Sequence, residues 1–225
     1  MGTKDLPAMI DYVLNYTKQK SLHYIGLSMG TTMFFVLLSM RPEYNAKIEL
    51  GICLGPIAIW KEISPAYQFF QSQKQIVREF FDINAIYDMF PLSSKSITMR
   101  RTLCTDEAIT QNVCVAIIFL MSGSDPAQLN TTILPKMVSY FPDGLSMQTL
   151  FHYFQNMMTD KFQAYDYGHL GNYKHYGQMT PITYDLKKVT APLALYYGAN
   201  DLIAPKSNVL EIYKHLPNVI LLEDR

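Results

Sequence analysis

SLHYIGLSMGTTMFFV, residues 21–36, contains the transition on which the expected architecture depends. An apolar, strand-like run ends at Ser28, which stands between Gly26 and Gly30, and a helix-like run follows at once. A G-x-S-x-G pattern in this context is typical of a strained strand-to-helix turn that lifts a serine hydroxyl above the edge of a sheet. The pattern also arises by chance, so its flanking strand and helix carry more weight than the motif itself. The sequence therefore predicts that Ser28 is a nucleophile.

The residues around Ser28 suit the stabilisation of negative charge. Gly26 and Gly30 have no side chains, so the strand and the helix can approach closely around the serine. The helix that begins at Met29 directs its N-terminus at the site, where its dipole and free N–H groups favour an anion. We expect the backbone N–H of Met29 to be an oxyanion donor.

The first 56 residues alternate between helical and strand patterns. A helical spacing of apolar residues runs through 5–19, at Ala8, Met9, Tyr12, Val13 and Tyr16. A short buried strand is expected over 22–27, a helix over 29–40 and a second strand over 48–54. Helices that alternate with strands in this way predict an α/β fold with a mostly parallel sheet.

The rest of the chain divides into two parts. Residues 57–179 carry mainly helical patterns and are expected to form a large helical cap, or lid, inserted into residues 1–56 and 180–225. The last part returns to the α/β pattern, with a strand over 192–198 and a helix over 206–216. The run NVILL, at residues 218–222, predicts a final strand.

Asp201 is the candidate acid partner of the serine. A Ser-Asp-His triad on this kind of fold places the acid just after a late strand, and Asp201 follows such a strand in LALYYGANDLIAP. Without Ser28, a loop Asx-turn or a helix start would be the favoured interpretation of this aspartate.

A histidine base is not found at the expected position, beyond the strand at 218–222. The chain has five histidines, His23, His152, His169, His175 and His215, and none follows that strand. Only one helical pattern precedes the serine strand, although a second oxyanion donor normally comes from a loop further upstream. Both ends of the core are therefore expected to be absent from this sequence.

Composition excludes several classes of function. The formal net charge is +0, which gives no indication of a nucleic-acid surface. The apolar runs are shorter than the ~18 residues of a membrane span. The three cysteines lack the close pairing of a zinc site, and we expect no metal or cofactor. The N-terminus shows no signal peptide pattern.

Several long segments, in order, resemble the acid lipase family, the lysosomal acid lipase and gastric lipase group of α/β hydrolases. They are DLPAMIDYVLNYT, KSLHYIGLSMGTT, LCTDEAITQNVCVAIIFLMSGSD, LSMQTLFHYFQNMMTDKFQAYDYG, NYKHYGQMTPITYDL and YYGANDLIAP. The family elbow is usually G-H-S-x-G, whereas Leu27 replaces the histidine here. The resemblance implies Ser28 as the nucleophile, Asp201 as the triad acid and the N–H of Met29 as half of the oxyanion hole.

The resemblance also implies a function and a location. Members are secreted or lysosomal hydrolases of triacylglycerols and sterol esters, so a neutral lipid ester and a lipid interface are the expected partners. Members carry their histidine a few residues beyond Arg225 and their upstream oxyanion loop before Met1. We therefore expect a truncated product with weak or no turnover. A non-catalytic lipid-binding or partner-binding remnant is the alternative, and nothing favours a third option, an acyltransferase.

Two kinds of modification follow from the same resemblance. Cys104 and Cys114 resemble the cap disulfide of the family. A continuous helix would separate them by ~15 Å, so a bridge requires the chain to reverse between them, and two buried thiols are the alternative. Asn130 resembles a family glycosylation site, and Asn15 starts a second sequon.

Overall fold

The computed structural model describes residues 1–89, 93–106 and 108–224. The chain forms two compact units, Met1–Glu62 with Gln155–Arg225, and Ile63–Phe154. The predicted boundaries of the cap, after residues 56 and 179, stay predictions; in this division, residues 57–62 and 155–179 group with the unit that contains the large sheet.

The first unit is built around a parallel sheet in the order β1-β2-β5-β6. Its strands are β1 (Leu22–Leu27), β2 (Ile48–Leu54), β5 (Leu193–Tyr197) and β6 (Val219–Asp224). Its helices are α1 (Asp5–Thr17), α2 (Met29–Met40), η1 (Pro42–Lys47), α9 (Gly168–Tyr176), η3 (Leu186–Lys188) and α10 (Lys206–His215), and the C-terminal part of α8 (Met147–Thr159) joins them. The predicted α/β class with a parallel sheet and many helices is thus confirmed.

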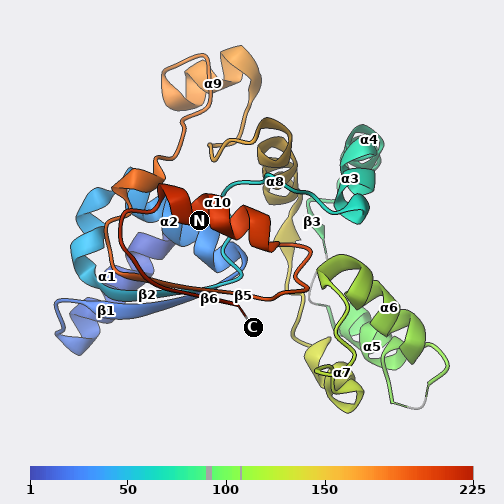
Figure 1. The fold of residues 1–225 in the computed structure, drawn as a ribbon. Coiled ribbons are helices and arrows are strands. Elements are labelled where there is room, and N and C mark those ends of the chain that lie inside the picture. The colour runs from blue at the N-terminus through green and yellow to red at the C-terminus, as the bar shows by residue number, and fades with distance from the viewer. Residues whose placement is uncertain (90–92, 107, 225) are drawn as a thin grey trace. The chain divides into compact units, whose positions relative to one another are not determined.

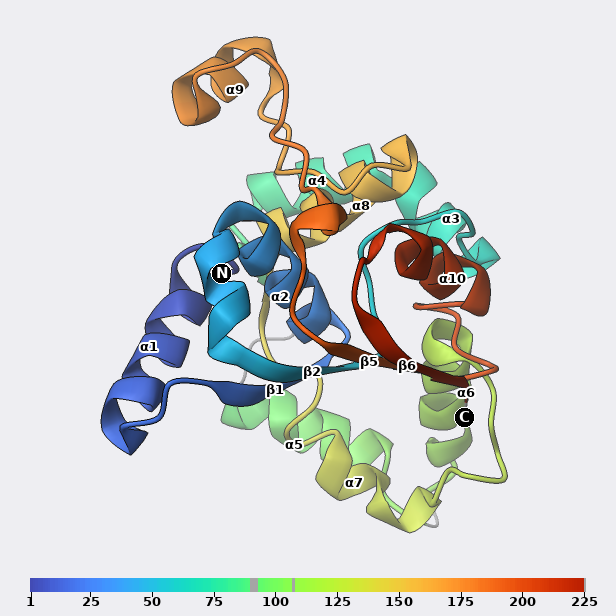
Figure 2. The ribbon, with the colours of Figure 1, turned by 60° about the vertical axis from the view of Figure 1, so that its left-hand side comes forward.

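The helices α1, α2 and α10 lie on the same side of this sheet (Figures 1 and 2). Their apolar side chains meet the strands in one core, which includes Leu6, Ile10, Leu14, Phe34, Phe35, Leu37, Cys53, Leu193, Leu195 and Ile212. Burying such side chains stabilises the fold by about 1.5–3 kcal/mol each. All four strands run in the same direction, so their carboxyl ends share one edge of the sheet.

Two details of burial differ from the prediction. The helix α1 forms where expected, but it buries Leu6, Ile10 and Leu14, while Met9 and Tyr16 are exposed. The strand β1 has the expected bounds, yet Ile25 and Leu27 are 66% and 64% exposed, so the expectation of a buried strand is wrong. The reason is that Ile25 and Leu27 lie on the face of this edge strand opposite to Leu22 and Tyr24, which pack against the core.

The second unit is mainly helical, as predicted for this part of the chain. It contains α3 (Pro65–Ser72), α4 (Lys74–Ile83), α5 (Ser94–Leu103), α6 (Gln111–Ser122), η2 (Thr131–Ile133), α7 (Leu134–Met137) and the start of α8. The two-residue strands β3 (Asp88–Met89) and β4 (Leu145–Ser146) pair antiparallel.

A disulfide joins Cys104, just after α5, to Cys114 in α6, with their Cα atoms 5.5 Å apart. The chain reverses between these two helices. Leu134 and Val138 pack against the bridge in a small core.

The third cysteine, Cys53, is a buried thiol in β2, where burial raises its pKa to about 12. Across the described residues, no helix is both long and apolar enough to cross a bilayer.

Candidate active site

Ser28 occupies the turn between β1 and α2 in an unusual conformation. Its φ is +50° and its ψ is −113°, a region that non-glycine residues seldom adopt. The backbone N–H of Ser28 donates to the carbonyl of Leu54 at the end of the neighbouring strand (2.9 Å). A serine at a helix N-cap usually accepts a backbone N–H with its hydroxyl, but the Ser28 side chain makes no such cap. The hydroxyl is therefore available for chemistry.

The two glycines of the motif have different roles. A Cβ at Gly26 would lie 3.0 Å from the carbonyl carbon of Gly30 and 2.8 Å from the ring of Tyr24. At Gly30 the nearest atom to a Cβ would be the Tyr24 hydroxyl oxygen at 3.7 Å, which is an ordinary contact. The close approach predicted around Ser28 thus depends on Gly26, and the expectation that Gly30 is also needed for it is wrong.

The start of α2 presents an unpaired donor beside the serine. The first N–H groups of a helix have no partner within the helix, and the N–H of Met29 donates to no other described residue. The N-terminal end of the helix dipole adds partial positive charge at the same place. This N–H is therefore free to bind a negatively charged oxygen, and its role as an oxyanion donor stays a prediction.

Asp201 follows β5 and uses its two carboxylate oxygens differently. Oδ1 accepts the backbone N–H groups of Ile203 (2.8 Å) and Ala204 (2.9 Å), so the Asx-turn that was the alternative interpretation is present. Oδ2 faces the backbone of Gly55 and would lie 3.4 Å from a Cβ there. Gly55 has a φ of +57°, and its N–H donates to the carbonyl of Tyr196 (2.8 Å). One carboxylate oxygen is thus fixed by the loop, and the other remains for a second partner.

The order of the strands brings Ser28 and Asp201 to the same edge of the sheet, on either side of β2. Ser28 follows β1 and Asp201 follows β5, and β2 lies between these two strands. Ser28 hydrogen-bonds to Leu54 at the end of β2, and the Asp201 carboxylate lies beside the next residue, Gly55. Ser28 and Asp201 therefore approach the same turn from opposite sides.

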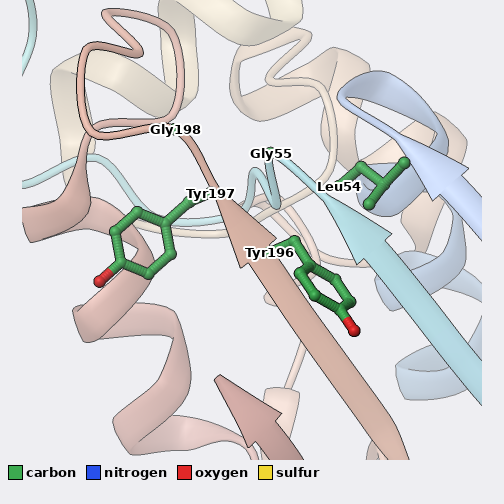
Figure 3. A pocket seen from close by; sticks show the side chains of 5 residues that line it. All are labelled: Leu54, Gly55, Tyr196, Tyr197 and Gly198. Carbon is green, nitrogen blue, oxygen red and sulfur yellow. The ribbon is translucent and has the colours of Figure 1, made fainter. Parts of the chain in front are cut away.

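A shallow pocket opens at this same turn (Figure 3). It has a volume of about 310 Å³ and is lined by Leu54, Gly55, Tyr196, Tyr197 and Gly198. The rings of Tyr196 and Tyr197 point to opposite sides of β5, as neighbouring side chains of a strand do (Figure 3). The pocket and the Asp201 carboxylate thus share Gly55.

The described residues of this unit bring no imidazole to the pair. Its histidines are His23, His169, His175 and His215. None of the four hydrogen-bonds to Ser28 or Asp201; the ring of His23 faces Glu49, for example, and that of His215 bonds the carbonyl of Glu211. The fifth histidine, His152, belongs to the other unit.

Three residues near the serine were not singled out from the sequence. Tyr24 donates its hydroxyl to the carbonyl of Gly30 (2.8 Å), and burial raises the pKa of Tyr24 to about 12, which keeps this donor protonated. Thr31 donates to the carbonyl of Ser28 (2.6 Å). Gly55 directly follows β2 and precedes Pro56. The Thr-Thr pair after G-x-S-x-G and the Gly-Pro pair after the second strand were the available signals.

The sequon residues lie on the surface. Asn15 is exposed on α1. Asn130 is exposed before η2, where its Oδ1 accepts the N–H and the hydroxyl of Thr132. Glycosylation of Asn15 and Asn130 stays a prediction.

A serine at a strand-to-helix turn, with helices packed on a parallel sheet, is the arrangement that the G-x-S-x-G motif adopts in α/β hydrolases. The curated proteins that match the chain are more specific. "Lipase 3" of Drosophila melanogaster is 35% identical over 98% of this chain and 56% of its own length. Human "Gastric triacylglycerol lipase" is 32% identical over 98% and 55%, and human "Lysosomal acid lipase/cholesteryl ester hydrolase" is 30% identical over 99% and 55%. The predicted resemblance to the acid and gastric lipases is thus confirmed along nearly all of this chain.

The chain spans a little over half the length of these curated relatives. No protein-family model matches it. Solved structures that match the chain include an epoxide hydrolase of Bacillus megaterium, at 10% identity and a TM-score of 0.45, covering 96% of this chain and 65% of the other. Another is a 2-hydroxy-6-oxo-6-phenylhexa-2,4-dienoate hydrolase of Rhodococcus, at 13% identity and a TM-score of 0.40, covering 94% and 58%.

Proposed function

We propose that this protein is a serine hydrolase of carboxylic esters that acts on neutral lipids, either triacylglycerols or sterol esters. The observation that carries the proposal is the placement of Ser28: its hydroxyl is not used as a helix cap, and its backbone joins the turn that also receives the Asp201 carboxylate. The names of the curated relatives supply the class of ester. We include in the proposal a lipid interface as the partner and a secreted or lysosomal location, which the names of the same relatives suggest.

In the proposed reaction, the hydroxyl oxygen of Ser28 attacks the ester carbonyl while a base removes its proton. The N–H of Met29 binds the oxyanion of the tetrahedral intermediate, which then collapses to an acyl-serine and releases the alcohol. Water attacks the acyl-serine in the same way, and the fatty acid leaves. Asp201 orients the base through Oδ2, since its Oδ1 is already bound by two backbone N–H groups.

A second candidate is a non-catalytic protein that binds a lipid or a partner through the same fold. One observation favours it: no histidine of the unit that carries Ser28 bonds to Ser28 or Asp201 in the described residues. A correctly positioned general base contributes about 10²–10⁴-fold to such a reaction. A protein without one would retain the fold and bind without measurable turnover.

Hydrolysis of a short-chain p-nitrophenyl ester, measured with and without added imidazole, tests the two candidates. Imidazole can act as a proton acceptor where no described histidine bonds to Ser28 or Asp201, so we expect an imidazole-dependent rate that requires Ser28. Ser28→Ala should abolish this increment, and Asp201→Asn should reduce it. Covalent labelling of Ser28 by a fluorophosphonate, located by mass spectrometry, gives an independent test.

Equal rates for the parent and Ser28→Ala, both with and without imidazole, together with no labelling of Ser28, would reject the hydrolase and leave the binding protein. If the protein hydrolyses the short ester through Ser28, turnover of trioctanoin or of a cholesteryl ester in mixed micelles distinguishes the two lipid classes. Ser39→Ala, which removes a buried hydroxyl elsewhere on α2, is the control for general loss of stability.

A further inference from the structure

Two successive threonines in the first turn of α2 hold the segment that follows β2. The hydroxyl of Thr31 accepts the backbone N–H of Ile57 (3.0 Å), and the hydroxyl of Thr32 donates to the carbonyl of the same residue (2.9 Å). Thr31 is fully buried, and Ile57 is 6% exposed. Both backbone groups of Ile57 are thereby satisfied by side chains of one helix turn.

Thr31 also binds the serine directly. Its hydroxyl donates to the carbonyl of Ser28 (2.6 Å), and its backbone N–H donates to the same oxygen (2.9 Å). A hydroxyl has one donor and two acceptor sites, so Thr31 can donate to Ser28 and accept from Ile57 at once. This side chain therefore links the residue with positive φ to the segment beyond β2.

The segment after β2 lies beside the carboxylate of Asp201. Gly55 lies two residues before Ile57, and it is the residue that the Asp201 carboxylate approaches. The path from Ser28 through Thr31 and Ile57 to Gly55 consists of two hydrogen bonds, of 2.6 and 3.0 Å, and the two peptide bonds between Ile57 and Gly55. A shift of the Ile57 segment on α2 would move Gly55, and hence the space beside Asp201, relative to Ser28.

We propose that Thr31 is a positioning residue, which fixes the Ser28 turn against the Gly55–Ile57 segment and so sets the placement of the nucleophile relative to the helix N-terminus and the acid. The proposal rests on the proposed function of Ser28. A purely structural hydroxyl would stabilise the unit without influencing the reactivity of the side chain at position 28. Thr31 acts through the backbone of Ser28 and Ile57 and touches no reacting atom.

A cysteine at position 28 reports on this placement without needing a histidine. In Ser28→Cys, the helix N-terminus should hold the thiol pKa below its free value of about 8.5. The rate of alkylation by iodoacetamide, followed from about pH 5 to about pH 10, the range over which thiols titrate, gives that pKa directly. Thr31→Val, Thr31→Ser and Ser39→Ala are then added to Ser28→Cys, and thermal unfolding is recorded for each.

We expect Thr31→Val to raise the thiol pKa toward its free value and to slow alkylation at neutral pH by about threefold to tenfold. Thr31→Ser keeps the hydroxyl and should restore the parent profile. Ser39→Ala should lower the melting temperature without changing the profile, since its hydroxyl bonds Val36 far along α2.

An unchanged pH profile in Thr31→Val, with only a lower melting temperature, would overturn the proposal and leave Thr31 a structural residue. If Thr31→Val unfolds, Thr31→Ser against Thr31→Ala provides the same comparison with a smaller change in shape. Fluorophosphonate labelling of the parent serine is measured separately. No labelling of Ser28 and no Ser28-dependent ester hydrolysis, alongside a hydroxyl-dependent thiol profile, would reject the hydrolase function and retain the positioning role of Thr31.

Discussion

At the scale of single residues, Ser28 combines a strained backbone with an unused side chain. Residues held in sparsely populated regions of φ and ψ cost of order 1–3 kcal/mol and persist where the surroundings enforce them. Here the enforcing contacts come from Leu54, Thr31 and the close approach of Gly26 to α2. A serine that served only to start a helix would relax to cap it, so the conformation supports the proposed role of the hydroxyl.

The two glycines of the motif provide a matched test of this geometry. Gly26→Ala should destabilise the protein by about 1–3 kcal/mol, because its Cβ meets the backbone of α2, which cannot move without distorting the turn. Gly30→Ala should range from neutral to about 1 kcal/mol more stable, since alanine favours a helix and its Cβ would make an ordinary contact with the Tyr24 hydroxyl. Urea unfolding of both variants measures the difference. Equal effects at the two positions would contradict the geometry described for the turn.

At the scale of elements, α1 is attached to η1 through a charged cluster. The carboxylate of Asp11 accepts from the Lys47 ammonium (2.6 Å) and from the Tyr44 hydroxyl (2.7 Å). The Lys47 hydrogen bond, followed by that of Tyr44, lowers the pKa of Asp11 from its usual value. The Lys47 ammonium also lies 4.1 Å from the centre of the Tyr44 ring. This cluster joins two segments that the sequence separates by more than a whole strand and helix.

The contribution of this cluster to the free energy of unfolding should depend on pH. Because the pKa of Asp11 is lowered in the folded state, its contribution is present above the unfolded pKa of about 3.9 and is lost as the pH falls through the folded pKa. Asp11 is 46% exposed, so screening should limit its coupling to Lys47 to about 1 kcal/mol or less. A double-mutant cycle of Asp11→Asn and Lys47→Met, measured by urea unfolding, should show coupling at neutral pH. Coupling that persists in full after Asp11 is protonated would argue against this assignment.

Elements were easier to predict than the faces they bury. The bounds of β1, α2 and β2 agree with the expected ones, because each is a short apolar run that ends at a recognisable signal: Ser28 of the motif, Arg41 with Pro42, and Gly55. The face of α1 was not predictable in this way. Apolar residues occupy both sides of that helix, so its periodicity does not reveal that Leu6, Ile10 and Leu14 are the side chains that meet the sheet. Packing against strands distant in sequence decides that choice.

The candidate site shows the same division between local and distant information. The motif predicted the turn at Ser28, and chain order predicted an acid after a late strand. The contact of Gly55 with Asp201 follows from the sheet order β1-β2-β5, which the sequence does not state. The hydrogen bonds of Thr31 likewise depend on how the segment after β2 returns to α2.

At the scale of the whole molecule, the sheet of the first unit has two unlike faces. The described helices α1, α2 and α10 of this unit pack on one side, and the other side carries apolar residues that remain accessible. These include Ile25, Leu27 and Leu221, which are 66%, 64% and 41% exposed. Parallel sheets are almost always covered on both faces, and an apolar edge strand is a site of self-association. We therefore expect the isolated protein to self-associate through this face.

Ile25→Lys tests this expectation, because lysine on an edge strand opposes pairing with another chain. The substitution should lower the average mass in sedimentation experiments at matched concentrations, with little effect on the melting temperature, since Ile25 buries little surface. Tyr16→Lys is the matched control: Tyr16 is 78% exposed on α1, away from the sheet face, and its replacement should leave the mass unchanged. A parent protein that sediments as a monomer, or an equal response of both variants, would show that the open face of the sheet does not drive association.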